Sequence, residues 1–297
     1  MQLMKTAQDY AGRLELSLQR FRYSLRGRYS HANEQQILRS YIDKLLPEEY
    51  PRTVVDIGAG NGVRWSNSYA LVHENWKALG IEADIGKYAL LARAYQRFPK
   101  AEACHSLASP ENINELLADF GVKKEFGVLS LDIDGNDFWV LDAILSEFRP
   151  GLVVTEINEN IPPPLRFVVK YNPAFQLRHH FFGHSISAVE DLCRRHGYGI
   201  VELEYNNAFL APAELGSQYF RDAKTAYREG YLNRPDRQTR FASNSDMEVL
   251  HSLKPEAALR FVREFFARDE GNYHLASDEE SFAGLAGEFM LARGNND

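Results

Sequence analysis

The stretch Leu129–Asp137, LSLDIDGND, closes a run of apolar residues with a group of acids. If the run is a β-strand, its two-residue periodicity puts Asp132 and Asp134 on the same face. Two carboxylates that end a buried strand are costly to desolvate, which favours a functional role for both. Either aspartate could act as a general base that takes a proton from an acceptor hydroxyl or amine.

The next predicted strand ends in TEIN, so Glu156 and Asn158 also point together, one strand over. With Asp132 and Asp134 they offer the hard oxygen donors that Mg²⁺ or Mn²⁺ prefers. Such an ion would orient a chelating acceptor and acidify its hydroxyl. In the competing interpretation, the acids of DGND are turn formers and helix caps, and Asp137 is the best candidate for a cap.

Three histidines, His179, His180 and His184, cluster between the predicted fifth strand and the helix after it. Ser185 is a plausible N-cap for that helix. His184 is either an ordinary loop histidine or a base or substrate contact on a loop at the carboxyl end of the sheet. We name it as the third catalytic candidate.

A second candidate functional stretch is Val54–Gly62, VVDIGAGNG. Its apolar run ends in Asp56 and is followed by Gly58, Gly60 and Gly62. Glycine is costly in backbone entropy, so three in five residues suggest that a ligand lies against this backbone. A dinucleotide fingerprint reads G-x-G-x-x-G. Here the third glycine comes one residue early, which argues against a nicotinamide oxidoreductase. The acid followed by G-x-G-x-G suits a ligand with an amino group and no phosphates, S-adenosylmethionine.

The following predicted strand, LGIEAD, ends with Glu82 and Asp84. An acid at this position, about 20 residues beyond the glycines, can accept hydrogen bonds from both ribose hydroxyls. Glu82 is the better candidate because it is the first acid after the apolar run. The competing interpretation makes Glu82 a solvated loop acid and the glycines a plain turn.

The elements that position these side chains alternate between apolar strands and helical stretches, which predicts an α/β fold with a parallel sheet covered on both faces. The last two strands lie too close for a helical crossover, so they form a hairpin and one runs antiparallel. The predicted strands are 53–58, 77–83, 101–106, 126–134, 151–158, 198–205 and 207–212. The predicted helices are 14–25, 34–46, 87–98, 112–121, 138–148, 185–197, 256–267 and 281–292.

The pattern of predicted helices and strands changes along the chain and predicts three parts. Residues 1–50 form a helical segment, residues 51–212 the sheet-containing core, and residues 213–297 a helical appendage without a sheet of its own.

Composition excludes several classes of protein. The 297 residues carry a net charge of −7 and no block of Lys and Arg, which disfavours a nucleic-acid partner. Cys104 and Cys193 are the only cysteines, so no disulfide framework or zinc spacing is present, and a reducing cytoplasm fits best. No apolar run approaches the ~20 residues of a membrane helix, and charges interrupt any signal-peptide core, so we expect no membrane association.

The sequence resembles class I S-adenosylmethionine-dependent methyltransferases over roughly residues 51–212, where VVDIGAGNG looks like their first motif and GIEAD like their second. The resemblance implies a doubly wound, Rossmann-like sheet of seven strands, mostly parallel with the last strand antiparallel. It further implies that His105 and Ser106, which end the third strand, lie near the adenine. The predicted cofactor-binding residues are Asp56, Gly58, Ala59, Gly60, Asn61, Gly62, Ser66, Asn67, Glu82, Ala83, His105, Ser106 and Asp132.

A narrower resemblance rests on SNSYAL, LSLDIDGNDFWVL, VVTEIN and FFGHSISAVEDL. These motifs look like a bacterial branch related to the FkbM-type methyltransferases. One departure is Asn33–Gln36, NEQQ, where a glycine followed by two acids is expected.

These observations predict a cytoplasmic methyltransferase that acts on an oxygen or nitrogen of a small molecule, with natural-product and peptide intermediates among the acceptors. One alternative is transfer of a modified group, such as carboxymethyl, with Arg64 or Arg166 as the extra basic contact. An alternative of another class is a non-catalytic cofactor-binding or scaffold protein. A homodimer is left open beside a monomer.

Overall fold

The computed structural model describes residue 18 and residues 27–282. The helices predicted at 14–25 and 281–292 fall outside this part, apart from Leu18, Ser281 and Phe282. Two compact units make up the chain. The first comprises Met1–Asp132 and Glu147–Val154, and the second comprises Ile133–Ser146 and Thr155–Asp297. The predicted three-part division, with boundaries near residues 50 and 212, stays a prediction.

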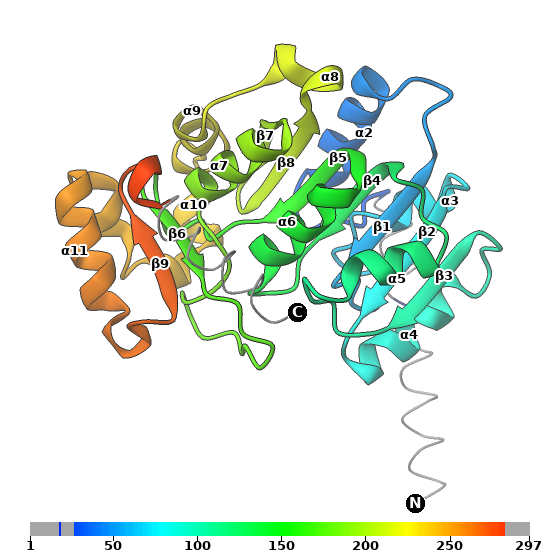
Figure 1. The fold of residues 1–297 in the computed structure, drawn as a ribbon, viewed down its shortest axis with the longest axis horizontal. Helices are drawn as coiled ribbons and strands as arrows, with labels where there is room; N and C mark the ends of the chain where they lie inside the picture. Colours follow the sequence, from blue (N-terminus) through cyan, green and yellow to red (C-terminus); the bar gives the residue numbers. More distant parts are fainter. Residues whose placement is uncertain (1–17, 19–26, 283–297) are drawn as a thin grey trace, which may run out of the picture. The chain divides into compact units, whose positions relative to one another are not determined.

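A seven-stranded sheet, with the order β3-β2-β1-β4-β5-β8-β7, organises the fold (Figure 1). β1 pairs in parallel with β2 and β4, and β2 pairs in parallel with β3. β7 and β8 form an antiparallel hairpin. The predicted doubly wound, mostly parallel sheet with an antiparallel last strand is therefore confirmed. The strands are β1 (Thr53–Ile57), β2 (Lys77–Glu82), β3 (Ala101–His105), β4 (Glu125–Leu131), β5 (Arg149–Glu156), β7 (Tyr198–Glu204) and β8 (Asn207–Pro212).

The helices of the first unit follow the sequence patterns closely. α2 (Glu34–Leu45), α4 (Ile85–Tyr95) and α5 (Ile113–Asp119) lie where helices are predicted. Asp84 is the N-cap of α4, because its side chain accepts a hydrogen bond from the Lys87 amide at 2.8 Å. A short helix, α3 (Tyr69–His73), was not predicted.

In the second unit, α6 (Asp137–Glu147) and α7 (Ile186–His196) are also confirmed, and α7 packs against β7. Ser185 caps α7 as predicted, since its side chain accepts a hydrogen bond from the Ala188 amide. Gly197 ends the helix in a left-handed conformation, with φ of 67°.

The chain after Pro212 is not purely helical. Its strand β9 (Tyr273–Ala276) pairs antiparallel with β6 (Arg166–Val169), and neither segment is among the predicted strands (Figure 1). Phe167 of β6 and Leu275 of β9 belong to one buried cluster that also includes residues of α11 (Pro255–Phe265). Both strands are only four residues long, which explains why alternation did not reveal them.

The other helical elements after Pro212 are short. They are α8 (Ala213–Gly216), η1 (Ser217–Tyr219), α9 (Ala223–Tyr227), η2 (Arg228–Leu232), α10 (Arg237–Arg240), η3 (Ala242–Asn244), η4 (Glu248–Ser252) and η5 (Ala267–Asp269).

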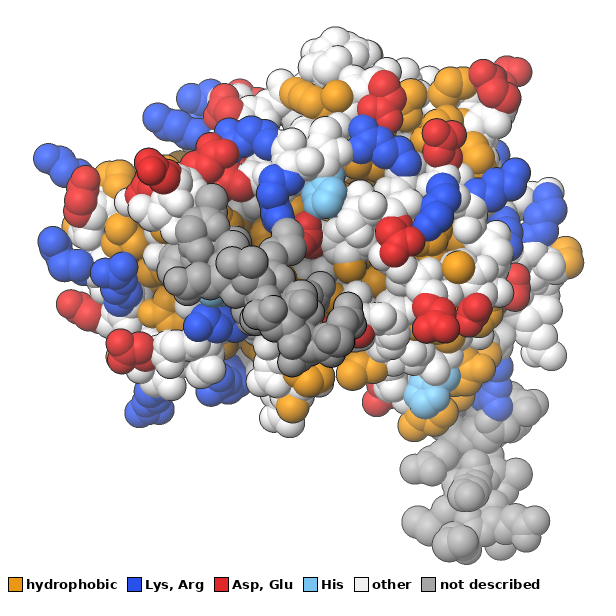
Figure 2. Space-filling view, viewed as in Figure 1, with side chains coloured by type: hydrophobic (Ala, Val, Ile, Leu, Met, Phe, Trp, Pro, Cys, Tyr) orange, Lys and Arg blue, Asp and Glu red, His pale blue; other side chains and the backbone are white. Residues whose placement is uncertain are grey.

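On the face drawn in Figure 2, Lys and Arg side chains are interspersed with Asp and Glu. Exposed ion pairs of this kind include Lys124 with Glu147 at 2.8 Å, and each such pair contributes little to stability. Among the described helices, none combines the length and the apolar character needed to cross a membrane.

Candidate functional site

The glycine loop leaves the carboxyl end of β1 in a left-handed backbone conformation. Gly58, Gly60 and Gly62 have φ values of 80°, 57° and 74°, which L side chains rarely adopt. A Cβ on Gly62 would lie 2.7 Å from Cδ1 of Leu91, so this glycine lets α4 pack closely. A Cβ on Gly60 would meet no atom within 4 Å. Gly60 therefore combines the left-handed backbone with an open face on which a ligand could lie.

Glu82 at the end of β2 holds this loop. One of its carboxylate oxygens accepts a hydrogen bond from the Gly60 amide at 2.8 Å, and the other accepts from the Asp84 amide at 2.8 Å. The side chain is buried rather than solvated, which argues against the loop-acid interpretation. Each carboxylate oxygen can accept more than one hydrogen bond, so the carboxylate retains capacity for ribose hydroxyls.

Asp56 lies under the loop, only 4% exposed. It accepts a hydrogen bond from the Ser68 hydroxyl at 2.5 Å, and burial raises its pKa. Ser66 accepts hydrogen bonds from the Ser68 and Tyr69 amides at 3.2 and 3.0 Å, which starts α3. Asp56 and Ser66 thus act together in joining β1 to α3, a role that the sequence did not reveal.

Three further predicted residues lie at the ends of β2 and β3. A ring nitrogen of His105 lies 3.0 Å from the Ala83 carbonyl oxygen, and the Ser106 amide donates to the Glu82 carbonyl at 3.2 Å. The ring of Tyr88, which sequence reasoning missed, lies 5.1 Å from that of His105. Its place on α4, one turn beyond Asp84, is the signal that was available. The structure therefore brings Glu82, Ala83, His105 and Ser106 together.

The loop residues Ala59, Asn61 and Asn67 complete the predicted cofactor set. The Ala59 amide donates to the Ile81 carbonyl at 3.1 Å. Asn61 accepts hydrogen bonds from two amides just after it in the loop, at 3.0 and 2.9 Å. Asn67 donates to the Ser130 hydroxyl at 3.5 Å. Asn61 therefore orders the loop from within, whereas Ala59 and Asn67 join it to β2 and β4.

The acids after β4 differ from their prediction in one respect. β4 ends at Leu131, and Asp132 and Asp134 are exposed, so no desolvation cost argues for their function. Asp134 has a φ of 59°, a left-handed conformation in which Asp is found more often than most residues. Asp134 and Glu156 of the second unit offer carboxylate oxygens within 4.8 Å of each other, in one group with Asp132, two residues before Asp134.

The buried acid of this loop is Asp137, the first residue of α6. It accepts hydrogen bonds from the Ile133 and Gly135 amides, both at 2.8 Å. Burial raises the pKa of Asp137 to about 6. Asp137 therefore acts as the turn former of the competing interpretation and not as a helix cap, because the amides that it binds precede α6, and it holds the loop that carries Asp134.

Asn158 has a structural role. It is fully buried, and its amide nitrogen donates to the His180 and Phe182 carbonyls at 2.8 and 3.0 Å. Its side-chain oxygen accepts two hydrogen bonds from Asn160, at 3.2 and 3.1 Å. Both lone pairs of that oxygen are used, which leaves none to coordinate a metal ion.

His184 also lies inside the protein, with no exposed surface. Neither ring nitrogen has a hydrogen-bond partner among the described residues. Burial lowers its pKa to about 3, so the ring is neutral at pH 7. A general base has to reach its substrate, and in this structure His184 is instead a core side chain beside Phe138, whose ring lies 5.7 Å away.

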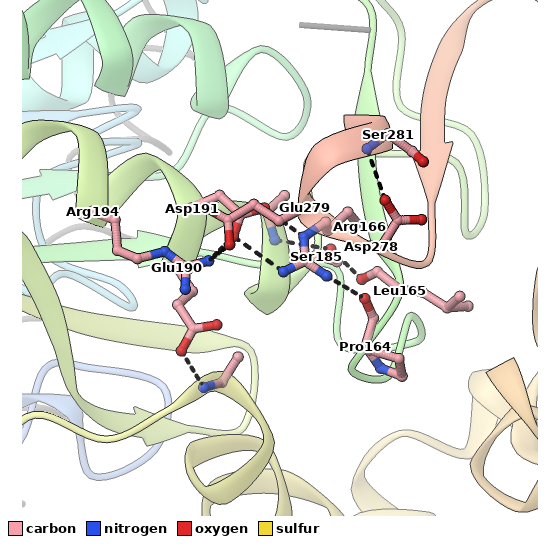
Figure 3. Close-up of polar contacts among 12 residues, drawn as sticks. Pro164, Leu165, Arg166, Ser185, Glu190, Asp191, Arg194, Asp278, Glu279 and Ser281 are labelled. Carbon is pink, nitrogen blue, oxygen red and sulfur yellow. Dashed lines mark hydrogen bonds and ion pairs between the residues drawn. The ribbon is translucent and has the colours of Figure 1, made fainter. Parts of the chain in front are cut away.

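Arg166 is engaged in a buried ion pair (Figure 3). Its Nε and Nη2 atoms lie 2.5 and 3.2 Å from the two carboxylate oxygens of Asp191, which also pairs with Arg194. Arg166 is therefore not available as a contact for a modified cofactor. Arg64, the other candidate, lies with its guanidinium 3.9 Å from the ring centre of Trp65.

A cavity of about 490 Å³ lies in the second unit, in the segment that follows β6. Phe175 joins this segment to the acid loop, because a Cβ on Gly135 would lie 2.2 Å from a Phe175 ring carbon. The Asn136 side chain also donates to the Asn172 carbonyl at 2.9 Å. The residues that line the cavity are Lys170, Tyr171, Asn172, Ala174, Phe175, Gln176, Arg178, Phe181 and Asn272.

No protein-family model and no curated protein sequence matches this chain. Among solved structures, the N-terminal domain of EvdMO1 with SAH bound is 9% identical and has a TM-score of 0.41, over 62% of this chain and 82% of that one. A TehB-like SAM-dependent methyltransferase from Corynebacterium glutamicum is 13% identical with a TM-score of 0.38, over 70% of this chain and 98% of that one. Likenesses at this level say nothing about the activity or the substrate of this chain.

Proposed function

We propose that this protein is an S-adenosylmethionine-dependent methyltransferase that acts on an oxygen or nitrogen of a small-molecule or peptide acceptor. The observation that carries the proposal is the left-handed glycine loop after β1, held through the Gly60 amide by Glu82 of the neighbouring strand. In doubly wound sheets, ligands bind beyond the carboxyl ends of the strands, where this loop lies.

The residues of the first unit fit this cofactor. The open face of Gly60 would receive it, and Glu82 would accept hydrogen bonds from its ribose hydroxyls. His105 and Ser106, which lie at the end of β3, would contact the adenine. When bound, S-adenosylmethionine would supply an electrophilic methyl group.

Asp134 or Asp132 would take the proton that the acceptor loses as its oxygen or nitrogen is methylated. Both carboxylates are exposed, so an acceptor can reach them from solvent. We infer that the acceptor binds in the cavity beside Phe175, since Phe175 packs on Gly135, the neighbour of Asp134. The catalytic contribution would be mainly positioning.

A hard cation, Mg²⁺ or Mn²⁺, held by Asp132, Asp134 and Glu156 remains part of the proposal. Close carboxylates repel one another unless a cation or a shared proton relieves them. Activity measured after exhaustive chelation, and again with Mg²⁺ or Mn²⁺ restored, tests this role. Full activity in chelator would eliminate the metal.

The test of the cofactor is calorimetry with S-adenosylmethionine and S-adenosylhomocysteine, in wild type and in Gly60→Val. We expect micromolar-range binding by wild type and none by the variant, because the branched side chain fills the open face of the loop. Gly121→Val is the matched control, since Gly121 also has a positive φ of 61° but lies outside the site. Tighter binding of NAD, or wild-type binding by Gly60→Val, would remove the proposal.

Carboxymethyl transfer is the second candidate, and a non-catalytic cofactor-binding or scaffold protein is the third. Mass spectrometry of products formed from labelled S-adenosylmethionine separates them, because only a methyltransferase adds a labelled methyl group to an acceptor. The relationship to the FkbM-type branch, the cytoplasmic location and homodimer formation stay predictions.

A further inference from the structure

A second group of metal-ligating side chains in the second unit consists of His179, His180 and Asp246. Each offers one ligand atom, and the three atoms lie within 4.8 Å of one another. Nε2 of His180 lies 2.8 Å from a carboxylate oxygen of Asp246, 66 residues away in the sequence. The ring centres of His179 and His180 are 3.7 Å apart. Two imidazoles and a carboxylate therefore converge.

The backbone conformation of His179 makes this convergence unusual. Adjacent residues of an extended chain point to opposite sides. His179 has a φ of 35°, a left-handed value that is uncommon for a residue of its size, and its ring lies against that of its neighbour. The turn is closed by a hydrogen bond from the Phe181 amide to the Arg178 carbonyl at 2.7 Å. Conformations of this kind cost energy and are often kept at functional sites.

His180 is positioned by contacts outside the group. Its side chain is only 4% exposed, and the ring of Phe265 lies 5.8 Å away. Asn158 fixes its carbonyl through a hydrogen bond of 2.8 Å, and the ring has a further hydrogen bond to the backbone of Ser243. Histidines that ligate metals usually have such a second contact, which sets the tautomer and the ring orientation.

We propose that His179, His180 and Asp246 bind a divalent transition-metal ion of the zinc class. Two imidazole nitrogens and one carboxylate oxygen form a three-ligand set that Zn²⁺ accepts, with water at the fourth position. Zinc–ligand bonds of roughly 2.0–2.2 Å place tetrahedral ligand atoms about 3.3–3.6 Å apart, so the Asp246 oxygen, 2.8 Å from Nε2 of His180, has to move slightly away from it. His179 and Asp246 are exposed and can make that movement. The nitrogen ligands distinguish this site from the all-oxygen group of Asp132, Asp134 and Glu156.

A bound ion would tie the turn at Arg178–Phe181 to the segment between η3 and η4. The same turn contributes Arg178 and Phe181 to the wall of the 490 Å³ cavity. The ion would therefore stiffen one wall of the cavity, whether or not the cavity binds a methyl acceptor. This role does not depend on the proposed function.

The test uses the full-length protein after metal removal with a chelator and dialysis. Zn²⁺ is titrated in competition with a chromophoric chelator, and Co²⁺ is followed by its visible absorption, which is intense only for four-coordinate ions. We expect one tight equivalent with the four-coordinate spectrum. His179→Gln and Asp246→Asn should each weaken binding at least about tenfold, since even the loss of an outer contact commonly costs that much.

Both substituted side chains are exposed, so the variants should fold, and circular dichroism of the metal-free proteins checks this. The matched control is His196→Gln, because Nε2 of His196 lies 2.7 Å from a carboxylate oxygen of Asp142 without a second histidine in the group. Asp134→Asn controls for the all-oxygen group. The proposal is overturned if no equivalent binds, if His179→Gln binds like wild type, or if Asp134→Asn rather than Asp246→Asn removes the ion.

Discussion

At the scale of single residues, the structure separates side chains that a ligand could reach from those that support the fold. Gly60 has an open face, Asp134 is exposed, and the Glu82 carboxylate can accept further hydrogen bonds. Asn158 and His184, in contrast, are fully buried. Residue type and spacing could not make this distinction, because a carboxamide or an imidazole has the same formula in a core as in a cleft. Two predictions belong to this scale.

Glu82→Ala should weaken S-adenosylmethionine binding by about 1–3 kcal/mol, because the ribose hydroxyls lose a charged acceptor and the Gly60 amide loses its partner. Calorimetry measures the change. Glu102→Ala, an exposed acid on the neighbouring strand β3, is the control and should bind like wild type. Equal binding by the two variants would move the cofactor elsewhere.

Asp134→Asn should reduce turnover by roughly two to four orders of magnitude while cofactor binding persists, since a positioned base typically contributes about that much. The comparison is with Asp43→Asn, an exposed aspartate of α2. Single-turnover methyl transfer is the measurement. Undiminished transfer by Asp134→Asn would leave Asp132 as the candidate base.

At the scale of elements, the loop between β4 and α6 shows how a helix start holds a reactive segment. The buried side chain of Asp137 accepts hydrogen bonds from two amides of the loop, and Asp134 of the same loop is exposed. The cost is a buried carboxyl group whose pKa is raised to about 6. This cost makes the stability of the loop depend on pH.

Folded Asp137 prefers the protonated form, so its contribution to the free energy of unfolding is full below its ordinary pKa of 3.8 and is lost as the pH rises through about 6. The two pKa values correspond to about 3 kcal/mol over the whole range. Asp137→Asn should remove this pH dependence. Urea denaturation at several pH values between 4 and 7.5 measures it, with the exposed Asp119→Asn as the control. An unchanged slope in Asp137→Asn would contradict the assignment.

At the scale of the whole molecule, each of the two compact units carries its own buried ionisable groups, such as Asp56 in the first and His184 in the second. Buried ionisable side chains decide how such a protein responds to acid, since the unfolded chain can protonate groups that the folded chain keeps neutral. His184 is the clearest case, because its pKa falls to about 3 in the folded state.

Because the folded protein keeps His184 neutral, the contribution of this residue to the free energy of unfolding is full above its ordinary pKa of 6.5. The contribution is lost progressively as the pH falls below that value. Leucine carries no titratable group, so lowering the pH from 8 to 5 should raise the free energy of unfolding of His184→Leu relative to that of wild type by about 2 kcal/mol. Denaturant unfolding at both pH values tests this, with His73→Leu, an exposed histidine, as the comparison. A gain of equal size in both variants would show that the effect is not due to burial.

The amino-acid sequence by itself determined the sheet, because buried strands and helices impose different periods on apolar residues over many positions. The seven strands, the helices α4, α5, α6 and α7 and the cap at Ser185 followed from such local patterns, whereas the short helix α3 did not. Only the tertiary structure decided which polar residues meet. The four-residue strands β6 and β9 are too short to show a period, and the pairing of His180 with Asp246 joins segments far apart in the chain. Only the tertiary structure shows which polar residues are buried. His184 and Asn158 are enclosed by residues from distant segments, which a local sequence pattern cannot identify.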